Sequence, residues 1–202
     1  MISLWLAIYF SVLIWSGINP KDYFTWILEV FPALIGFIIL ALTYNKFRLT
    51  PLADFLILIH CIILMVGGHY TYAEVPLFNW IRDFFSLGRN NYDKLGHLAQ
   101  GFIPAIVARE ILLRLKVVAG KGWLAFIVVC ICLAISAFYE LVEWWTALLS
   151  GASAEAFLGT QGYIWDTQSD MALALVGSVL ALLLLSKLHD TQLLNIEINS
   201  RT

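Results

Sequence analysis

Residues 171–188 read MALALVGSVLALLLLSKL, and this stretch decides the fold because it is almost entirely apolar until Lys187. A helix needs roughly 20 mainly apolar residues to cross the hydrocarbon core of a bilayer. A helix that is hydrophobic all round must be buried, either in a large protein core or in lipid. We therefore predict a transmembrane helix over this stretch.

The composition extends this prediction to the whole chain. Hydrophobic residues make up 61% of the sequence and charged residues 13%, against roughly 45–50% and 25% in ordinary soluble domains. So few charges cannot cover a water-facing surface, and lipid must solvate the outside. Five further apolar stretches lie before residues 171–188 in the chain, at Ile2–Gly17, Tyr23–Tyr44, Leu52–Val66, Leu95–Leu115 and Gly122–Leu149. The sequence thus predicts an all-α polytopic membrane protein, a bundle of about six transmembrane helices.

Two segments do not fit a spanning helix. Val75–Leu87 is too polar to span, but its apolar residues recur at helical spacing with Arg82 and Asp83 opposite, which predicts one amphipathic helix lying in the interface. Residues 189–202 are polar, and we expect a loosely ordered C-terminal tail. The transmembrane domain would then occupy residues 1–188 as a single unit.

The net charge and the positions of the cysteines argue against several classes of protein. The net charge is −2 and no basic run exists, so nucleic acid is not an expected partner. Cys61, Cys130 and Cys132 lie in apolar stretches and are expected to be buried hydrophobic residues, not a disulfide framework. No Lys or Arg precedes the first apolar stretch, and a small-residue cleavage site is lacking, so we expect a retained helix and not a cleaved signal peptide.

The placement of Lys and Arg predicts the orientation. With six spans, both termini and the second and fourth loops share one side, which collects Lys46, Arg48, Arg109, Arg114, Lys116, Lys121, Lys187 and Arg201. The other side has only Lys21, Arg82, Arg89 and Lys94. The N- and C-termini are therefore predicted to be cytoplasmic, with Arg109, Glu110 and Arg114 acting as ordinary interfacial anchors.

On this topology, polar residues from several helix ends gather on the outward side. Asp93, His97 and Gln100 share one helix face, Glu140 and Glu143 lie near the end of the next span, and Asp166 and Asp170 open the last one. Ionisable residues at membrane depth are costly and are functional candidates by default. The predicted polar site comprises His69, Asp93, Lys94, His97, Gln100, Glu140, Glu143, Gln161, Trp165, Asp166, Gln168 and Asp170.

These residue types suit acid–base chemistry or metal binding. His97, Glu140 and Asp166 are the catalytic candidates. Lys94 would contact an anionic lipid headgroup, and Trp165 would line the entrance to the site. No cofactor is specified, but a divalent metal ion is possible, with candidate ligands Asp93, His97, Glu140, Asp166 and Asp170. No H-E-x-x-H or G-x-S-x-G motif accompanies them, so the metal hypothesis rests on the convergence of ligand types alone.

Structural explanations compete with this hypothesis. Asp93 and Asp166 could be helix N-caps, and Lys94 could extend to the headgroups. Glu140 and Glu143 could mark the water boundary of a long helix. His60 is expected to hydrogen-bond a neighbouring helix, and Glu29 is expected either to pair with a charge or to lie at the outer boundary.

Three blocks carry a resemblance to a known family. Residues 93–102 (DKLGHLAQGF), 139–144 (YELVEW) and 159–171 (GTQGYIWDTQSDM) resemble the YjdF-type bacterial inner-membrane proteins, over essentially the whole chain. The resemblance implies a multi-pass protein of the cytoplasmic membrane and leaves its chemistry open. The layout of Asp93-Lys94…His97, Glu140 and Asp166…Asp170 is also similar to VanZ-like membrane proteins, although the intervening sequence differs.

Three functions remain open. The first is a membrane enzyme that acts on a lipid or envelope substrate at the outward site. The second is a transporter of a small solute or ion, which would need a polar path through His60, Asp54 and Glu29. The third is a non-catalytic subunit or assembly factor with a protein partner. The distances from His97 to Glu140 and Asp166 distinguish one shared site from separate caps and anchors.

Overall fold

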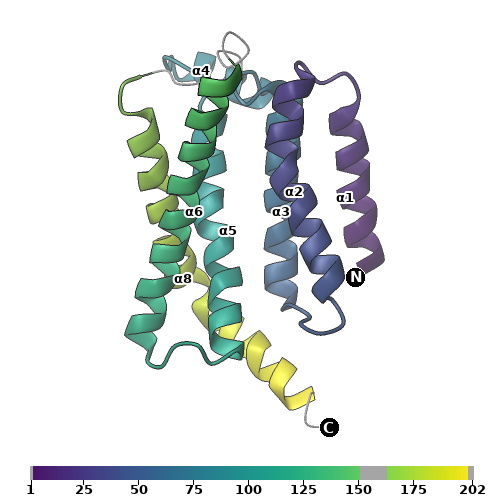
Figure 1. The fold of residues 1–202 in the computed structure, drawn as a ribbon, viewed down its shortest axis with the longest axis vertical. Helices are drawn as coiled ribbons and strands as arrows, with labels where there is room; N and C mark the ends of the chain where they lie inside the picture. Colours follow the sequence, from purple (N-terminus) through teal and green to yellow (C-terminus); the bar gives the residue numbers. More distant parts are fainter. Residues whose placement is uncertain (1, 151–162, 200–202) are drawn as a thin grey trace.

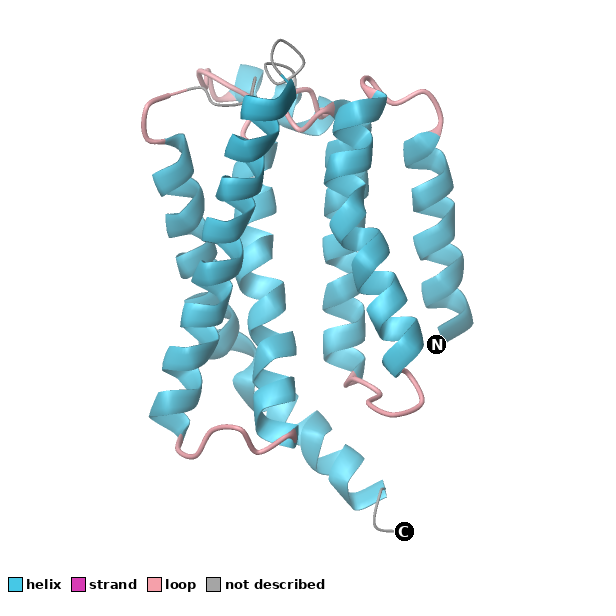
Figure 2. Cartoon of the chain, in the orientation of Figure 1, coloured by secondary structure: helices cyan, strands magenta, loops and turns pink. Residues whose placement is uncertain are grey.

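A computed structural model describes residues 2–150 and 163–199 of the chain. Within these two ranges all regular structure is helical, as Figure 2 shows. Each predicted apolar stretch coincides with one helix, and the all-α prediction is confirmed. The helices are α1 (Ile2–Gly17), α2 (Tyr23–Thr43), α3 (Pro51–Tyr70), α4 (Pro76–Phe84), α5 (Tyr92–Arg114), α6 (Lys121–Ser150) and α8 (Asp166–Asn199).

The long helices run alternately up and down, and the two termini lie toward the same end of the bundle (Figure 1). Helix α4 lies across the opposite end. We call these the terminal end and the α4 end. Helices α1, α2 and α3 pack together as one half, α5, α6 and α8 pack together as the other, and α3 against α5 joins them.

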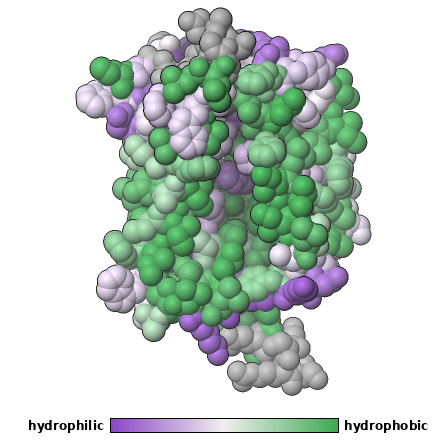
Figure 3. Space-filling view, viewed as in Figure 1, coloured by the Kyte–Doolittle hydropathy of each residue, from purple (hydrophilic) through white to green (hydrophobic). Residues whose placement is uncertain are grey.

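The outer surface supports a membrane location. Four helical segments are long and apolar enough to cross a bilayer: Tyr23–Thr43, Pro51–Tyr70, Lys121–Thr146 and Asp166–Ile196. Helix α1 is apolar but shorter, and α5 is long but carries many polar residues. On the face shown in Figure 3, a broad apolar belt crosses the middle of the molecule, with hydrophilic residues gathered toward both ends. The length and composition of these helices are consistent with a multi-pass membrane protein.

Helices α5 and α8 approach each other at two glycines. A Cβ atom on Gly101 would lie 1.9 Å from the backbone oxygen of Ala174, and one on Gly177 would lie 2.2 Å from that of Leu98. Small residues of this kind let helix backbones meet inside a membrane. Because the contact is so close, polar side chains on α5 reach partners on α8 at both ends of the bundle.

The C-terminal segment departs from its prediction. Helix α8 continues to Asn199, so residues 189–199 are helical and not loose. His189 is fully buried against α5, and the side-chain oxygen of Gln192 accepts a hydrogen bond from the backbone N–H of Leu52 at 2.9 Å. Polarity indicated exposure, but these polar groups find partners on α3 and α5.

The polar segment before α5 forms the short helix α4. It covers Pro76–Phe84, a shorter stretch than the predicted residues 75–87. Leu77, Trp80 and Phe84 on this helix are exposed. The buried side chain of Asn90 donates to the backbone oxygen of Val75 at 3.1 Å, which ties the start of α4 to the start of α5.

Candidate functional site

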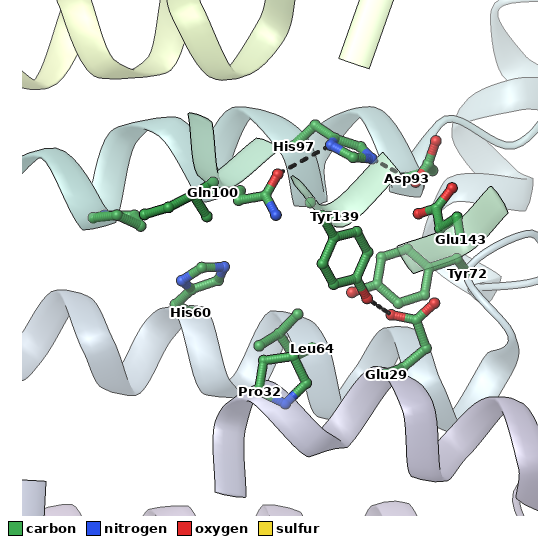
Figure 4. Close-up of a pocket in the computed structure, with 13 residues that line it drawn as sticks. Glu29, Pro32, His60, Leu64, Tyr72, Asp93, His97, Gln100, Tyr139 and Glu143 are labelled. Atoms are coloured by element: carbon green, nitrogen blue, oxygen red, sulfur yellow. Dashed lines mark hydrogen bonds and ion pairs between the residues drawn. The ribbon is translucent and has the colours of Figure 1, made fainter. Parts of the chain in front are cut away.

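A cavity of about 150 Å³ lies between the two halves of the bundle, toward the α4 end. Helices α2, α3, α5 and α6 and the turn after α3 supply its walls. Polar side chains face it from all of these elements (Figure 4), and the lining residues are Glu29, Pro32, His60, Leu64, Tyr72, Asp93, Gly96, His97, Gln100, Pro104, Ile135, Tyr139 and Glu143.

His97 is the centre of the polar cluster. Its Nε2 atom lies 3.4 Å from Asp93 Oδ1 on the same helix, 3.6 Å from Glu140 Oε1 on α6 and 4.0 Å from Asp170 Oδ2 on α8. Residues from three helices therefore converge on one ring nitrogen. Glu143 completes a second group with His97 and Glu140, whose ligand atoms all lie within 4.8 Å of one another. We call Asp93, His97, Glu140, Glu143 and Asp170 the His97 cluster.

The other ring nitrogen of His97 has a different neighbour. Nδ1 lies 3.2 Å from the side-chain oxygen of Gln100, one helical turn away. An amide oxygen only accepts hydrogen bonds, so Nδ1 carries a hydrogen and donates it. A neutral His97 would then turn the lone pair of Nε2 toward the surrounding carboxylates.

A second set of ion pairs lies beside the His97 cluster. The Lys94 ammonium contacts Asp166 and lies 2.7 Å from both Ser169 Oγ and Asp170 Oδ1. Arg89 lies 2.8 Å from Asp166 Oδ2. The Lys94 charge is therefore neutralised inside the protein by carboxylates of α8, and its contact with a lipid headgroup stays a prediction. Asp166 joins the site through Lys94, which also holds Asp170.

The helix-cap explanation also fails for Asp93. The N-cap of α5 is Asn91, and Asp93 lies within the first helical turn. The carboxylate of Asp93 is directed to His97 at 3.4 Å and to Arg89 at 3.5 Å. Glu140 does not mark a water boundary either, since only 8% of it is exposed. These residues belong to one interior cluster.

Two buried polar atoms near His97 have no hydrogen-bond partner among the described residues. They are Oε1 of Glu140 and Oγ of Ser136, which lies one turn earlier on α6. Buried polar groups are nearly always paired, and an exception needs an explanation. At Glu140 the unpaired oxygen is the one that faces His97 Nε2.

The opposite wall of the cavity contains residues that the sequence did not assign to the site. The hydroxyl of Tyr139 on α6 donates to Glu29 Oε2 on α2 at 2.9 Å, which bridges the two halves. Figure 4 places the ring of Tyr72 beside this pair and turns His60 of α3 toward the cavity. No hydrogen bond to His60 occurs in the described part of the chain, contrary to the expected interhelical bond.

The backbone around the cavity is irregular in ways that the sequence could have signalled. Pro32 of α2 and Pro104 of α5 lie inside helices and line the cavity. A helix-interior proline removes the usual donor to the carbonyl four residues earlier, and such breaks are tolerated at membrane depth where they line a cavity. Thr71 and Tyr72 both have positive φ, 57° and 56°, so the turn after α3 brings the Tyr72 ring back against Gly67 and Gly96.

Four predicted site residues do not join the cluster. His69 hydrogen-bonds the backbone oxygen of Ser16 at 3.0 Å, and its ring centroid lies 4.5 Å from that of Trp15, so it packs α3 against α1. Trp165 and Gln168 are exposed at the start of α8. Gln161 lies outside the described residues. Hydropathy alone placed His69, Trp165 and Gln168 at the α4 end of the bundle but could not give the direction of each side chain.

A second buried polar cluster lies at the terminal end. Glu110 is fully buried and accepts hydrogen bonds from Thr50 Oγ1 at 2.7 Å, Arg114 Nη1 at 2.8 Å and His189 Nε2 at 3.1 Å. Arg109 Nη1 donates to His189 Nδ1 at 2.9 Å, and a guanidinium has no acceptor, so His189 is the tautomer that donates from Nε2. The interpretation of Arg109, Glu110 and Arg114 as interfacial anchors is therefore wrong.

Comparisons with known proteins agree with the sequence resemblance. The model of the family described as "Predicted membrane protein (DUF2238)" matches residues 1–191. Inner membrane protein YjdF of Escherichia coli (strain K12) is 52% identical over 182 residues, which cover 90% of this chain and 87% of that protein. No solved structure is similar to this chain. The predicted resemblance to the YjdF-type proteins is confirmed.

Proposed function

The chain belongs to the DUF2238 family of membrane proteins, and we propose that it is an enzyme of the bacterial inner membrane that acts on a lipid or envelope substrate. The single observation that carries this proposal is the His97 cluster. Carboxylates from three helices surround one imidazole beside a cavity, and one buried oxygen is left without a hydrogen bond. Arrangements of this kind are typical of catalytic sites, where polar groups await a substrate or ion.

The position of the cavity supports a membrane substrate. Figure 3 shows a hollow on this face between α6 and α2, with hydrophilic surface visible at its base and apolar side chains on both walls. A molecule in the lipid phase can approach such a hollow sideways, with its polar part toward His97 and its apolar part between the helices. A cavity of about 150 Å³ accommodates the reacting part of such a substrate and not the whole lipid.

The residues divide into two roles. His97 lines the cavity, Glu140 lies 3.6 Å from its Nε2 atom, and the two act as the acid–base pair. Asp166, Lys94 and Arg89 form the ion pairs behind them and position Asp170 and Asp93. Asp166 is accordingly a positioning residue, although the sequence alone suggested a catalytic one.

The proposal includes a topology. Six helices, α1, α2, α3, α5, α6 and α8, would span the membrane, with α4 lying in the outer interface through exposed Leu77, Trp80 and Phe84. The short α1 and the polar α5 would complete the bundle because α5 pairs its polar groups internally. Lys46, Lys116, Lys121 and Lys187 mark the terminal end, so the positive-inside rule supports cytoplasmic termini and a periplasmic α4 end.

The test uses the lipids of a strain of E. coli that lacks YjdF. The wild-type chain, His97→Gln and the control His69→Gln are expressed to equal amounts of folded protein, and envelope lipids are measured by mass spectrometry. We expect the wild type and His69→Gln to convert at least one lipid or lipid-linked species, and His97→Gln to do so roughly 100-fold more slowly or worse. Identical lipid profiles for the wild type and His97→Gln would overturn the proposal.

Transport is the second candidate, because His60 extends the polar lining of the cavity away from the α4 end. The packing beyond His60 argues against a continuous path. Leu56, Ile103 and Ile106 are buried in one apolar core cluster on α3 and α5, and they fill the interior toward the terminal end. If His60→Ala abolished a proton or ion flux into proteoliposomes that the wild type supports, transport would replace the enzyme proposal.

A further inference from the structure

The distances around His97 Nε2 do not describe good hydrogen bonds. The Asp93, Glu140 and Asp170 oxygens lie 3.4, 3.6 and 4.0 Å from it, whereas direct hydrogen bonds between nitrogen and oxygen are about 2.7–3.2 Å long. None of these oxygens therefore forms a close hydrogen bond with Nε2. The ligand atoms of His97, Glu140 and Glu143 all lie within 4.8 Å of one another, so one ion between them would be within reach of each.

The spacing suits a coordination sphere. Nitrogen and oxygen ligands bind ions such as Zn²⁺ at about 2.0–2.2 Å, so neighbouring ligand atoms around one ion are roughly 3.0–3.6 Å apart. His97 Nε2 with Asp93 Oδ1 and Glu140 Oε1 falls within this range at 3.4 and 3.6 Å. Asp170 Oδ2, at 4.0 Å from Nε2, groups with Asp93 and His97 in a second set of ligand atoms.

Two further observations point independently to a cation. Glu140 is 8% exposed, and its Oε1 atom has no hydrogen-bond partner although it is directed at His97. In addition, His97 Nδ1 donates to the Gln100 side-chain oxygen. Histidines that bind a metal through one nitrogen almost always donate the other N–H to such an acceptor, which fixes the tautomer.

We propose that His97, Glu140 and Glu143 bind one divalent transition-metal ion, with Asp93 and Asp170 next to it. One imidazole with several carboxylates suits Mn²⁺, Fe²⁺ or Zn²⁺ better than Ca²⁺, which prefers oxygen ligands alone. The inference deepens the proposed function, since the ion would polarise or position the substrate in the adjoining cavity. The metal site itself rests on the ligand geometry and does not require the enzyme activity.

The charges of the site explain why a dication is needed there. Arg89 and Lys94 already neutralise Asp166 and part of Asp93 and Asp170. No Lys or Arg lies within ion-pair distance of Glu140 or Glu143 in the described part of the chain. A bound dication would compensate these buried carboxylates, which otherwise repel each other at short range in a low-dielectric interior.

The experiment is metal binding to the purified full-length chain in detergent, after treatment with a chelator. Mn²⁺ alone is titrated and followed by electron paramagnetic resonance, with Zn²⁺ measured by calorimetry. We expect one ion per chain, with a nitrogen hyperfine coupling to Mn²⁺. Glu140→Gln and Glu143→Gln should each weaken binding by roughly tenfold or more, and His97→Gln should remove the nitrogen coupling.

The control is His69→Gln, which changes a histidine at the same end but outside the cluster and should bind as the wild type does. Folding of each variant is checked by size-exclusion chromatography and by its Tm without metal. Binding that is absent in the wild type, or that persists unchanged in both Glu140→Gln and His97→Gln, would overturn the proposal. Because no substrate is used, metal binding without any lipid conversion would refute the enzyme proposal and leave the metal site standing.

Discussion

The molecule has a buried polar cluster at each end of the α5–α8 pair, and the two clusters differ in how completely they are paired. At the terminal end, Glu110 accepts from Thr50, Arg114 and His189, and Arg109 connects His189 to Asp190. At the α4 end, the acidic groups of the His97 cluster outnumber their donors. Glu140 Oε1 remains unpaired there.

The difference separates a structural role from a functional one. A buried ion network with every group satisfied can hold helices in register, although removing one partner is strongly destabilising. A cluster with surplus carboxylates beside a cavity is an unfavourable arrangement for the folded state, and proteins keep such arrangements at functional sites. Helices α5 and α8 therefore carry a structural cluster at one end and a candidate site at the other.

The largest expected loss of stability follows from a substitution at the terminal end. Glu110→Gln places an amide N–H₂ group where Arg114 and His189 donate, so at least one buried donor loses its acceptor. We expect a loss of about 3–5 kcal/mol in the free energy of unfolding, measured by denaturant or thermal unfolding in detergent. The control is Glu74→Gln, because Glu74 is exposed. A Glu110→Gln chain as stable as this control would remove the distinction between the clusters.

A smaller loss of unfolding free energy is expected where α5 and α8 cross, between the two clusters. Gly101→Ala puts a methyl group about 1.9 Å from the Ala174 backbone oxygen, so α5 and α8 must separate. We expect a loss of about 1–3 kcal/mol from overpacking. Gly36→Ala is the matched control, since nothing lies within 4 Å of a Cβ atom there. Equal unfolding free energies for the two variants would show that the close contact is not needed.

The sequence predicted the helices well because hydropathy and length decide them. All the apolar stretches became helices, and the polar blocks at residues 93–100, 140–143 and 166–170 do meet at one end. The sequence did not predict the direction in which individual side chains point. His69 lies at the correct end but turns toward α1, and Lys94 pairs with carboxylates of α8, which the sequence did not predict.

Residues far apart in the chain account for the remaining failures. Tyr139 and Glu29 meet across the cavity, and His189 meets Glu110 across α5 and α8. These contacts depend on which helices are neighbours, and hydropathy does not specify helix order in the membrane plane. The prolines at positions 32 and 104 were the available signal for the cavity, since both interrupt otherwise regular spans.

The most direct test of the distinction is the unfolding free energy of Glu140→Gln, measured in metal-free detergent beside Glu110→Gln. Removing one of several crowded carboxylates relieves repulsion and leaves no buried donor unpaired. We therefore predict a stability within about 0.5 kcal/mol of the wild type, or above it. A loss as large as that of Glu110→Gln would contradict the account, because the His97 cluster would then hold the helices together as the terminal cluster does.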